Sequence, residues 1–313
     1  MVRLGIDLGG TNIAVGLTDE KGTLLCRHSN PTGVGRAREE ILSDICRTAA
    51  EVCQQYGIST EDVASIGIGV PGSVNKAECK MVFGTNLGMN QVRFEEVFRP
   101  TFTCPVYIDN DANCAALGEC YGGAGLGCKS MVMVTLGTGI GGGLVFDGHI
   151  FSGCGDVAGE IGHMVIQVDG EPCNCGKRGC WETYASASAA IRMVKQAMEE
   201  HPESLLHEVA KEQGKIGALN LFLARDRGDA VACEVFDKYV RYLSIGVGNL
   251  IAILQPERVI IGGGIIGQGE KLLAPLREQV YAELMMAEGK KTEILAATAG
   301  NDAGIIGAAM LDS

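Results

Sequence analysis

The sequence predicts a duplicated α/β fold, because the same series of short apolar runs and glycine-rich turns occurs twice along the chain. In the first half, a run at 2–8 leads through a Gly-Gly turn into a run at 13–17. In the second half, a run at 131–136 leads through another glycine-rich turn into a run at 144–146. Stretches with helical periodicity follow each series. Strands that alternate with helices indicate an α/β domain, and a repeated unit implies a cleft between its two copies.

The first half divides into strands and helices in a simple order. Strands are expected where apolar or alternating residues form short runs that end at turn residues. A helix is expected at 39–55, where apolar side chains recur three or four residues apart, and an alanine-rich helix follows at 113–120. The expected strands of this half are 2–8, 13–17, 23–28, 64–70 and 106–108.

The second half repeats this plan. Asp147-Gly148 is typical of a tight hairpin turn between two of its strands. The expected strands are 131–136, 144–146, 149–151 and 258–261, and the expected helices are 182–199 and 233–254.

The chain has 313 residues, which is long enough for two domains. No linker rich in proline, serine or charge separates the halves, so we place the boundary near residue 110. The expected small α/β domain is 1–110 together with a C-terminal helix at about 298–313. The expected large α/β domain is 111–297 and contains a cysteine-rich loop.

Composition and charge exclude several classes of function. The formal net charge of −12 argues against a nucleic acid or an anionic membrane as partner, because phosphate binding needs clustered Lys and Arg. No apolar run approaches the length of a membrane span, and Met1 leads directly into a strand pattern without a signal peptide. Most of the 13 cysteines are scattered singly, so we expect reduced thiols. These features predict a soluble cytoplasmic protein.

The most specific motif combines one histidine with three cysteines in a short stretch. Zinc prefers four tetrahedral ligands drawn from thiolates and imidazoles, and three cysteines with one histidine form a common structural set. Gly176 and Gly179 let the loop turn tightly, and Glu160 and Glu182 flank it, so a bound ion would hold these two carboxylates around a pocket. The expected ligands of one structural Zn²⁺ are His163, Cys173, Cys175 and Cys180.

Two glycine-rich turns at matching positions of the halves suggest a nucleotide site. Glycines let backbone N–H groups approach a phosphate closely, Thr11 and Asn12 add side-chain donors, and Asp7 is placed to hold a Mg²⁺ shell. Neither turn is a Walker A loop or a dinucleotide fingerprint. Gly262-Gly263-Gly264 could pack flat against an adenine, although a plain strand-to-helix turn explains it as well. The expected nucleotide-binding residues are Asp7, Gly9, Gly10, Thr11, Asn12, Gly137, Thr138, Gly139, Gly263 and Gly264.

The combined motifs resemble those of the ROK family, which contains repressors, open reading frames and sugar kinases. The similarity runs from residue 7 to residue 264, and the segment 173–188 resembles the bacterial ROK-type glucokinases in particular. Trp181 and Thr85 depart from the family pattern at the rim of its sugar site. The motifs that carry the resemblance are Asp7-x-Gly-Gly-Thr11, Gly69-x-Pro-Gly72, Asn110-Asp111, Leu136-Gly-Thr-Gly139, Glu160-x-x-His163 and Cys-x-Cys-Gly-x-x-Gly-Cys-x-Glu182.

The resemblance implies an actin-like fold of two ribonuclease H-like halves, with ATP and Mg²⁺ bound in the cleft between them. It implies that Asp111 is the general base that takes the proton from the sugar 6-hydroxyl, since phosphoryl transfer needs one base besides positioning and charge stabilisation. Asp109 is expected to cap the next helix or to support the fold. The residues implied to bind the sugar hydroxyls are Gly72, Asn86, Asn110, Asp111, Glu160, His163 and Glu182.

We therefore predict a hexose kinase that uses ATP, with D-glucose at O6 as the first candidate and a dimer or tetramer as the expected assembly. N-acetylmannosamine, mannose, allose and N-acetylglucosamine are alternative substrates within this class. A sugar-sensing repressor would need a DNA-binding helix-turn-helix, which we do not expect in this acidic chain. An actin-like interaction protein would have no reason to keep the cysteine-rich loop together with Glu160, Asp111 and Glu182. Polyphosphate is less favoured than ATP as donor, because a polyanion needs a more basic surface.

Overall fold

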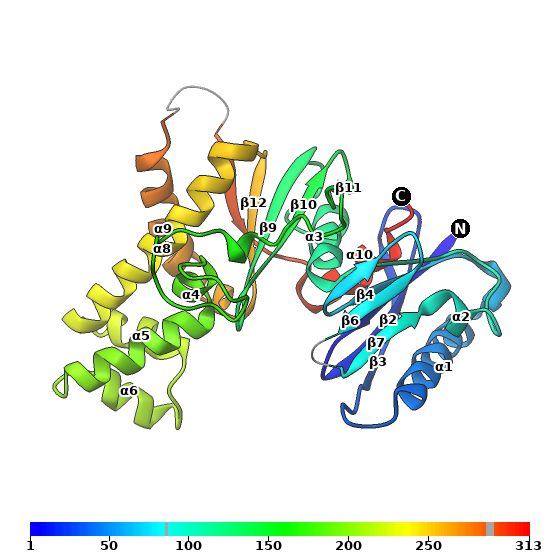
Figure 1. Ribbon diagram of the computed structural model, residues 1–313, viewed down its shortest axis with the longest axis horizontal. Helices are drawn as coiled ribbons and strands as arrows, with labels where there is room; N and C mark the ends of the chain where they lie inside the picture. Colours follow the sequence, from blue (N-terminus) through cyan, green and yellow to red (C-terminus); the bar gives the residue numbers. More distant parts are fainter. Residues whose placement is uncertain (85–86, 286–290) are drawn as a thin grey trace. The chain divides into compact units, whose positions relative to one another are not determined.

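The structure is a computed structural model that describes residues 1–84, 87–285 and 291–313 (Figure 1). It has the mixed α/β architecture that the sequence predicts. The chain divides into two compact units. Unit 1 consists of Met1–Met131, Gly143–Gly159 and Ala297–Ser313, and unit 2 consists of Val132–Gly142 and Glu160–Ala296.

The first five-stranded sheet has the strand order β3-β2-β1-β4-β8. β2 pairs antiparallel with both β1 and β3, whereas β4 pairs parallel with β1 and β8. Ile6 in the middle of β1 lies opposite Val15 of β2 and Ile68 of β4. The strands are β1 (Val2–Leu8), β2 (Asn12–Thr18), β3 (Leu24–Pro31), β4 (Val63–Val70) and β8 (Val106–Asn110).

The second five-stranded sheet has the order β11-β10-β9-β12-β13, which is the order of the first sheet repeated with later strands. β10 pairs antiparallel with β11, and β12 pairs parallel with β13. The prediction of two halves with one plan is therefore confirmed, although the last strand, β13, was not predicted. The strands are β9 (Ser130–Leu136), β10 (Ile140–Phe146), β11 (His149–Ile150), β12 (Arg258–Gly262) and β13 (Glu293–Ala296).

A small antiparallel sheet of three strands was not predicted from the sequence. Its strands are only three to five residues long, which is too short for a clear periodic pattern. The strands, in the order of the sheet, are β5 (Ser73–Asn75), β6 (Lys80–Gly84) and β7 (Met89–Arg93).

One face of the first sheet packs against α1 (Arg38–Tyr56) and the short α2 (Phe94–Phe98). Leu4 and Ile6 of β1 are fully buried in the same apolar core as Ile41 and Ile45 of α1. The predicted helix at 39–55 is thus confirmed, and its apolar periodicity is the face that covers the sheet. It ends at Gly57, whose left-handed backbone (φ 84°) terminates the helix.

The other face of the first sheet packs against α10 (Ala303–Ala309), which in turn packs against α3 (Asp111–Gly122). Glycines allow this close approach: a Cβ on Gly5 of β1 would lie 1.9 Å from the carbonyl oxygen of Ile305. A Cβ on Gly118 of α3 would likewise lie 1.9 Å from the carbonyl oxygen of Ala303. These contacts hold both β1 and α3 closely against α10.

The boundary predicted near residue 110 differs from the division that the structure shows. α3 belongs to unit 1 because it packs against α10 and β4. The chain leaves unit 1 after Met131, inside β9, and returns at Gly143, inside β10. The C-terminal segment from Ala297 also belongs to unit 1, and its helix is shorter than the predicted 298–313.

Unit 2 adds a group of helices to its sheet, and two predicted helix boundaries change there. The helix predicted at 182–199 is two helices, because Ser186 is extended and caps the second one by accepting from the N–H of Ala189 at 3.0 Å. The helix predicted at 233–254 begins earlier, after the N-cap Asp229. The helices are α4 (Glu182–Ala185), α5 (Ala187–Glu200), α6 (Leu206–Glu212), α7 (Ala218–Asp226), α8 (Ala230–Leu254) and α9 (Glu270–Glu283).

Short 3₁₀ helices complete the described chain. They are η1 (Thr60–Asp62), η2 (Ile161–His163), η3 (Gly264–Gln268) and η4 (Gly300–Asp302).

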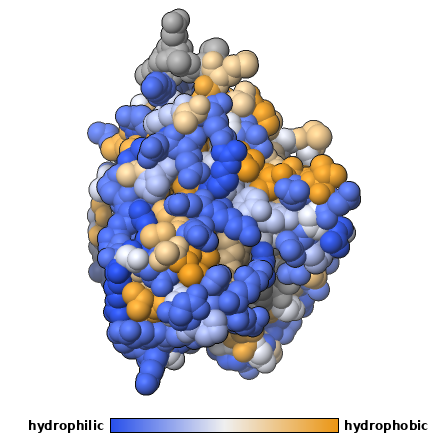
Figure 2. Space-filling view, turned by 90° about the vertical axis from the view of Figure 1, so that its left-hand side faces the viewer, coloured by the Kyte–Doolittle hydropathy of each residue, from blue (hydrophilic) through white to orange (hydrophobic). Residues whose placement is uncertain are grey.

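The surface carries mainly hydrophilic residues on the face that Figure 2 presents, with smaller hydrophobic groups between them. In the described ranges of the chain, no helix is both long enough and apolar enough to cross a bilayer.

Candidate functional site

The first group of predicted site residues lies in unit 1, where β8 ends and α3 begins. Asn110 is the N-cap of α3: its backbone is extended, and its Oδ1 accepts a hydrogen bond from the N–H of Ala112 at 2.9 Å. Asp111 is the first residue of the helix and is exposed, and its Oδ1 also lies 2.9 Å from that N–H. The cap is therefore Asn110, so of the two roles expected for Asp109, helix cap or support of the fold, the first is wrong.

Asp109 has a supporting position instead. It is only 1% exposed. Its Oδ1 accepts hydrogen bonds from the backbone N–H of Asn110 at 2.7 Å and from Nδ2 of Asn113 at 2.8 Å. Its Oδ2 forms an ion pair with Nζ of Lys76. The two neighbouring carboxylates thus differ completely: Asp111 faces outward, and Asp109 is enclosed by donors.

Asp7 lies at the end of β1, close enough to Asp111 for the two charges to interact. Burial, and to a smaller extent the negative charge of Asp111, raise the pKa of the Asp7 carboxyl to about 6. Gly304 of α10 covers this carboxylate, since a Cβ there would lie 2.5 Å from its Oδ2. A carboxylate in this position could hold Mg²⁺, a hard cation that prefers oxygen ligands.

Two hydrogen bonds hold the glycine-rich turn that follows Asp7. The backbone N–H of Gly9 donates to the carbonyl of Asn12 at 2.9 Å, and Oγ1 of Thr32 donates to the carbonyl of Gly9 at 2.7 Å. Gly10, Thr11 and Asn12 are exposed. The turn therefore presents backbone and short polar side chains that could bind a phosphate.

Gly72 is joined directly to the β8–α3 junction. Its carbonyl oxygen accepts a hydrogen bond from Nδ2 of Asn110 at 3.1 Å. Its φ of 118° and the 2.0 Å that would separate a Cβ from the carbonyl oxygen of Phe83 both require glycine. Asn86, also expected to bind the sugar, lies outside the described residues.

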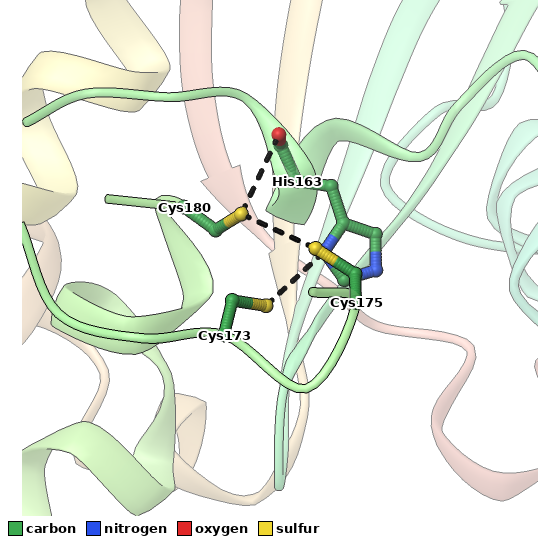
Figure 3. A group of neighbouring side chains, drawn as sticks. All are labelled: His163, Cys173, Cys175 and Cys180. Atoms are coloured by element: carbon green, nitrogen blue, oxygen red, sulfur yellow. Dashed lines mark hydrogen bonds between the residues drawn. The ribbon is translucent and has the colours of Figure 1, made fainter. Parts of the chain in front are cut away.

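The second group of predicted site residues lies in unit 2 and contains the histidine and the three cysteines (Figure 3). Their ligand atoms all lie within 4.8 Å of one another. Cys173 Sγ lies 3.6 Å from His163 Nδ1, and Cys175 Sγ lies 3.6 Å from Cys180 Sγ. The structure therefore brings together all four predicted ligands, and the group could hold a metal ion.

Two carboxylates flank this cluster, as the sequence predicts. Glu182 Oε1 accepts a hydrogen bond from the Cys173 thiol at 2.9 Å and lies 3.4 Å from His163 Nδ1. Glu160 Oε2 lies 3.9 Å from the other ring nitrogen of His163, Nε2. The histidine therefore turns Nδ1 toward the cysteines and keeps Nε2 on the side of Glu160.

The thiols of the cluster differ in acidity. Burial, and then the hydrogen bond to Glu182, raises the pKa of Cys173 to about 12. The pKa of Cys175 is lowered, chiefly by a hydrogen bond from the backbone N–H of Lys177. Because metals bind the thiolate form, loading this cluster would release protons and would become weaker at low pH.

The second glycine-rich turn lies beside the same cluster. The backbone N–H of Gly137 donates to the carbonyl of Gly139 at 3.0 Å, and Gly137 and Thr138 are exposed. A Cβ on Gly139 would lie only 2.3 Å from Glu182 Oε2. Within unit 2, the predicted phosphate turn and a predicted sugar-binding carboxylate are therefore in contact.

Gly263 begins the 3₁₀ helix η3 at the end of β12. Its φ is 93°, and a Cβ would lie 2.2 Å from the carbonyl oxygen of Leu136. The structure thus explains this glycine by a strand-to-helix turn, while Gly263 and Gly264 remain exposed. Their contact with an adenine stays a prediction.

Trp181 was expected at the rim of a sugar site, and this is wrong. Its side chain is fully buried, Nε1 donates to the carbonyl oxygen of Tyr242 at 2.9 Å, and its ring fills the space beside Gly246. The tryptophan therefore anchors the end of the cysteine-rich loop to α8. Its indole needs an internal acceptor, which the carbonyl of Tyr242 supplies.

The structure thus sorts the described site residues into two groups, one in each unit. Asp7, Gly72, Asn110 and Asp111 gather at the strand ends of unit 1, and the cysteine-rich loop with Glu160 and Glu182 gathers in unit 2. Sequence reasoning missed Lys76, the ion-pair partner of Asp109. A single lysine in a turn carries no motif, so only the fold could reveal this role.

The two five-stranded sheets of one strand order, with glycine-rich turns and acidic side chains at strand ends, define a duplicated α/β protein. The model of the ROK family matches residues 3–313. A glucokinase of Halalkalibacterium halodurans is 38% identical over 98% of this chain and 94% of its own. A glucokinase of Thermotoga maritima is 38% identical over 98% of this chain and 96% of its own. The chain belongs to the ROK family.

A solved structure supports the same relation. The ROK family glucokinase from Streptomyces griseus, in complex with glucose and AMPPNP, has a TM-score of 0.78 and 34% identity to this chain. The match covers 99% of both chains.

Proposed function

We propose that this protein is an ATP-dependent hexose kinase that phosphorylates D-glucose at O6 and gives glucose 6-phosphate. The observation that carries the proposal is the nearly full-length similarity to glucokinases, one of them solved with glucose and AMPPNP. The geometry of the β8–α3 junction agrees with it, because one exposed carboxylate stands at the start of a helix whose cap and backbone are fixed.

Asp111 is the proposed general base. It is exposed at the first position of α3, where a carboxylate can reach a hydroxyl group of a bound sugar. The base takes the proton of the attacking 6-hydroxyl as the oxygen bonds to the γ-phosphorus of ATP and ADP leaves. Asn110 keeps this residue at the helix start through its cap, so the carboxylate is aimed before the sugar binds.

The remaining sugar hydroxyls are proposed to bind residues of both groups. A pyranose offers alternating donors and acceptors, which amides, carboxylates and an imidazole satisfy. In unit 2, Nε2 of His163 stays on the side away from the cysteines and can contact a hydroxyl. The proposed sugar-binding residues are Gly72, Asn86, Asn110, Asp111, Glu160, His163 and Glu182.

ATP is proposed to bind at the two glycine-rich turns, through Gly9 to Asn12 and Gly137 to Gly139. Asp7 would hold Mg²⁺, which neutralises charge on the transferred phosphoryl group. Gly263 and Gly264 are proposed to lie against the adenine. We prefer ATP to polyphosphate as the phosphoryl donor. A cytoplasmic location is proposed as well.

Zn²⁺ is the proposed ion of the cysteine-rich loop. Sulfur ligands at about 2.3 Å and a nitrogen ligand at about 2.0–2.1 Å in a tetrahedron lie roughly 3.5–3.8 Å from one another. The separations of 3.6 Å between Cys175 and Cys180 and between Cys173 and His163 fit this geometry. Four protein ligands make a closed structural site, so the ion would hold Glu160 and Glu182 in place and take no part in the reaction.

A coupled assay of ADP release over a panel of sugars tests the function. We expect the highest kcat/KM for D-glucose, followed by mannose and the N-acetylated hexosamines, and no ADP release without sugar. A higher kcat/KM for an N-acetylhexosamine would overturn glucose as substrate and keep the kinase. Sugar binding without any ADP release would instead favour a sugar-sensing regulator.

The assembly state is a separate proposal. We expect a homodimer or homotetramer, and light scattering of the purified protein measures its mass directly.

A further inference from the structure

Asp109 is a buried carboxylate with three partners in unit 1. The backbone N–H of Asn110 and the side-chain amide of Asn113 donate to its Oδ1 at 2.7 Å and 2.8 Å. Asn110 in turn holds the carbonyl of Gly72 and the first turn of α3 with its own side chain. The position of Asn110 and the start of α3 therefore depends on the orientation of the Asp109 carboxylate.

Lys76 supplies the positive charge that this carboxylate needs. It lies in the turn between β5 and β6, and its Nζ contacts both Oδ2 of Asp109 and Oγ of Ser152. The turn is braced, because Asn75 exchanges two hydrogen bonds with Glu78, at 3.2 Å and 3.1 Å. Among the described residues, Lys76 is the cation that forms an ion pair with Asp109.

We propose that Lys76 is a positioning residue for phosphoryl transfer: it holds the Asp109 carboxylate, which fixes Asn110 and thereby aims Asp111. This inference rests on the proposed kinase function. It adds a residue that touches neither the sugar nor the nucleotide, but acts through a chain of contacts from the β5–β6 turn to the start of α3.

The physical reason is the cost of an unpaired buried charge. Without the ammonium group, the carboxylate of Asp109 would be left in an enclosed position with only neutral donors. A cavity of about 180 Å³ lies beside the pair and is lined by Lys76, Asp109, Tyr107 and His149. The unpaired carboxylate would turn toward this cavity and release the N–H of Asn110.

The charge of Lys76 also acts on a thiol of α3. The Cys114 thiol lies fully buried on the first turn of α3. Burial raises its pKa well above the ordinary value, and the carboxylates of Asp109, Asp7 and Asp111 raise it further, whereas Lys76 lowers it. Lys76 is thus within electrostatic reach of the first turn of α3, as well as in contact with Asp109.

The test compares K76M with K80M. Lys80 lies on β6 and pairs with Glu78 at 2.8 Å, and Glu78 keeps a second cation, Arg93, when Lys80 is removed. For K76M we expect the sugar KM to rise about tenfold and kcat to fall about 10- to 100-fold, the range for a misplaced reacting group. The KM for Mg-ATP should stay within about twofold, and K80M should resemble the wild type in all constants.

The double variant K76M/D109N distinguishes positioning from simple loss of stability. The amide oxygen of residue 109 would still accept from Asn110, and no charge would be left unpaired, so we expect most of the lost kcat to return. K76R should also keep activity, because the cavity gives room for a longer cation. A K76M variant that loses affinity for sugar and Mg-ATP equally, or is not improved by D109N, would overturn the proposal.

Hydrogen exchange of residues 106–122, followed by mass spectrometry, provides a readout independent of activity. We expect faster exchange at the start of α3 in K76M and normal exchange in K80M; equal protection in all proteins would overturn the proposal.

If the wild type phosphorylates no hexose, the proposed function fails, and this exchange still decides whether Lys76 positions α3. If K76M does not fold, the variant S152A replaces it, because it loosens Lys76 without leaving Asp109 unpaired. We expect S152A to raise the sugar KM about two- to fivefold. An unchanged sugar KM would count against the proposal.

Discussion

The acidic junction of unit 1 and the cysteine-rich loop of unit 2 hold the carboxylates of the proposed site in two different ways. At the junction, Asp111 stands on a strand end and a capped helix, fixed by hydrogen bonds among neighbouring residues. The loop between His163 and Glu182 has little regular structure, with isolated bridges at Val165–Cys180 and Pro172–Arg178. Hydrogen bonds within the protein therefore hold the junction, whereas we propose that the loop needs a bound ion.

The largest expected effect is the loss of the base at the junction. In D111N the carboxylate becomes an amide that cannot take a proton, and a positioned base contributes about 10²–10⁴-fold. We expect kcat to fall by that factor, with a modest rise of the sugar KM because the side chain also contacts the sugar. Steady-state kinetics on protein shown to be folded by circular dichroism measures both constants.

A substitution in the cysteine-rich loop is expected to reduce activity through loss of the metal ion. C180S removes one ligand of the proposed zinc site, and a structural zinc can contribute on the order of 10 kcal/mol of apparent binding free energy. We expect loss of bound zinc, a disordered loop and a sugar KM at least tenfold higher, an order-of-magnitude expectation for misplaced binding groups. Elemental analysis, limited proteolysis and kinetics check these three results.

C154S is the matched control, because Cys154 is an exposed free cysteine outside the cluster. It should keep zinc and activity. Clearly less than one zinc per chain in active wild-type protein would contradict the structural role of the ion.

A substitution of Asp7 is expected to change the unfolding free energy and kcat in opposite directions. Its folded-state pKa of about 6 lies above the usual value, so the folded protein binds this proton more tightly than the unfolded chain. The favourable contribution is full below about pH 4 and is lost as the pH rises through 6. In D7N, we therefore expect the unfolding free energy at pH 7 to rise by up to roughly 3 kcal/mol, and kcat to fall through the loss of Mg²⁺.

Urea unfolding without added Mg²⁺, repeated between pH 4 and pH 8, measures the stability difference. Asp19 offers a control of opposite sign: its pKa is lowered, chiefly by the backbone N–H of Thr23, so D19N should lose stability above about pH 4. An unfolding free energy of D7N below that of the wild type at pH 7 would contradict the account.

The smallest expected effect on catalysis is that of D109N. The new amide can still accept a hydrogen bond from the N–H of Asn110. Lys76 keeps its contact with Ser152 and still lines the cavity. We expect a lower unfolding free energy but a kcat within about tenfold of the wild type, well short of the loss of a general base.

Much of the fold follows from patterns in the sequence. The apolar runs of β1, β4 and β9 and the periodicity of α1 reflect burial on both faces of a sheet or on one face of a helix. The strands β5 to β7 escaped prediction, because strands of three to five partly exposed residues are too short to show such a pattern. The break at Ser186 did too, since a serine inside a helical stretch can either continue the helix or cap a new one.

The candidate site was predictable where a motif fixes both residue type and spacing. The four residues of the metal cluster could be named from the sequence, and the structure brings them together. The capping role of Asn110 and the burial of Trp181 depend on neighbours far along the chain, such as Gly72 and Gly246. Those neighbours, like the pairing of Lys76 with Asp109, are set by the topology and have no local signal.

The most direct measurement compares kcat of D111N and D109N side by side, at saturating glucose and Mg-ATP, after both are shown to be folded. The account predicts that D111N loses at least about 10²-fold while D109N stays within about tenfold of the wild type. A near-normal kcat for D111N, or equal losses in both variants, would contradict the assignment of Asp111 as the general base.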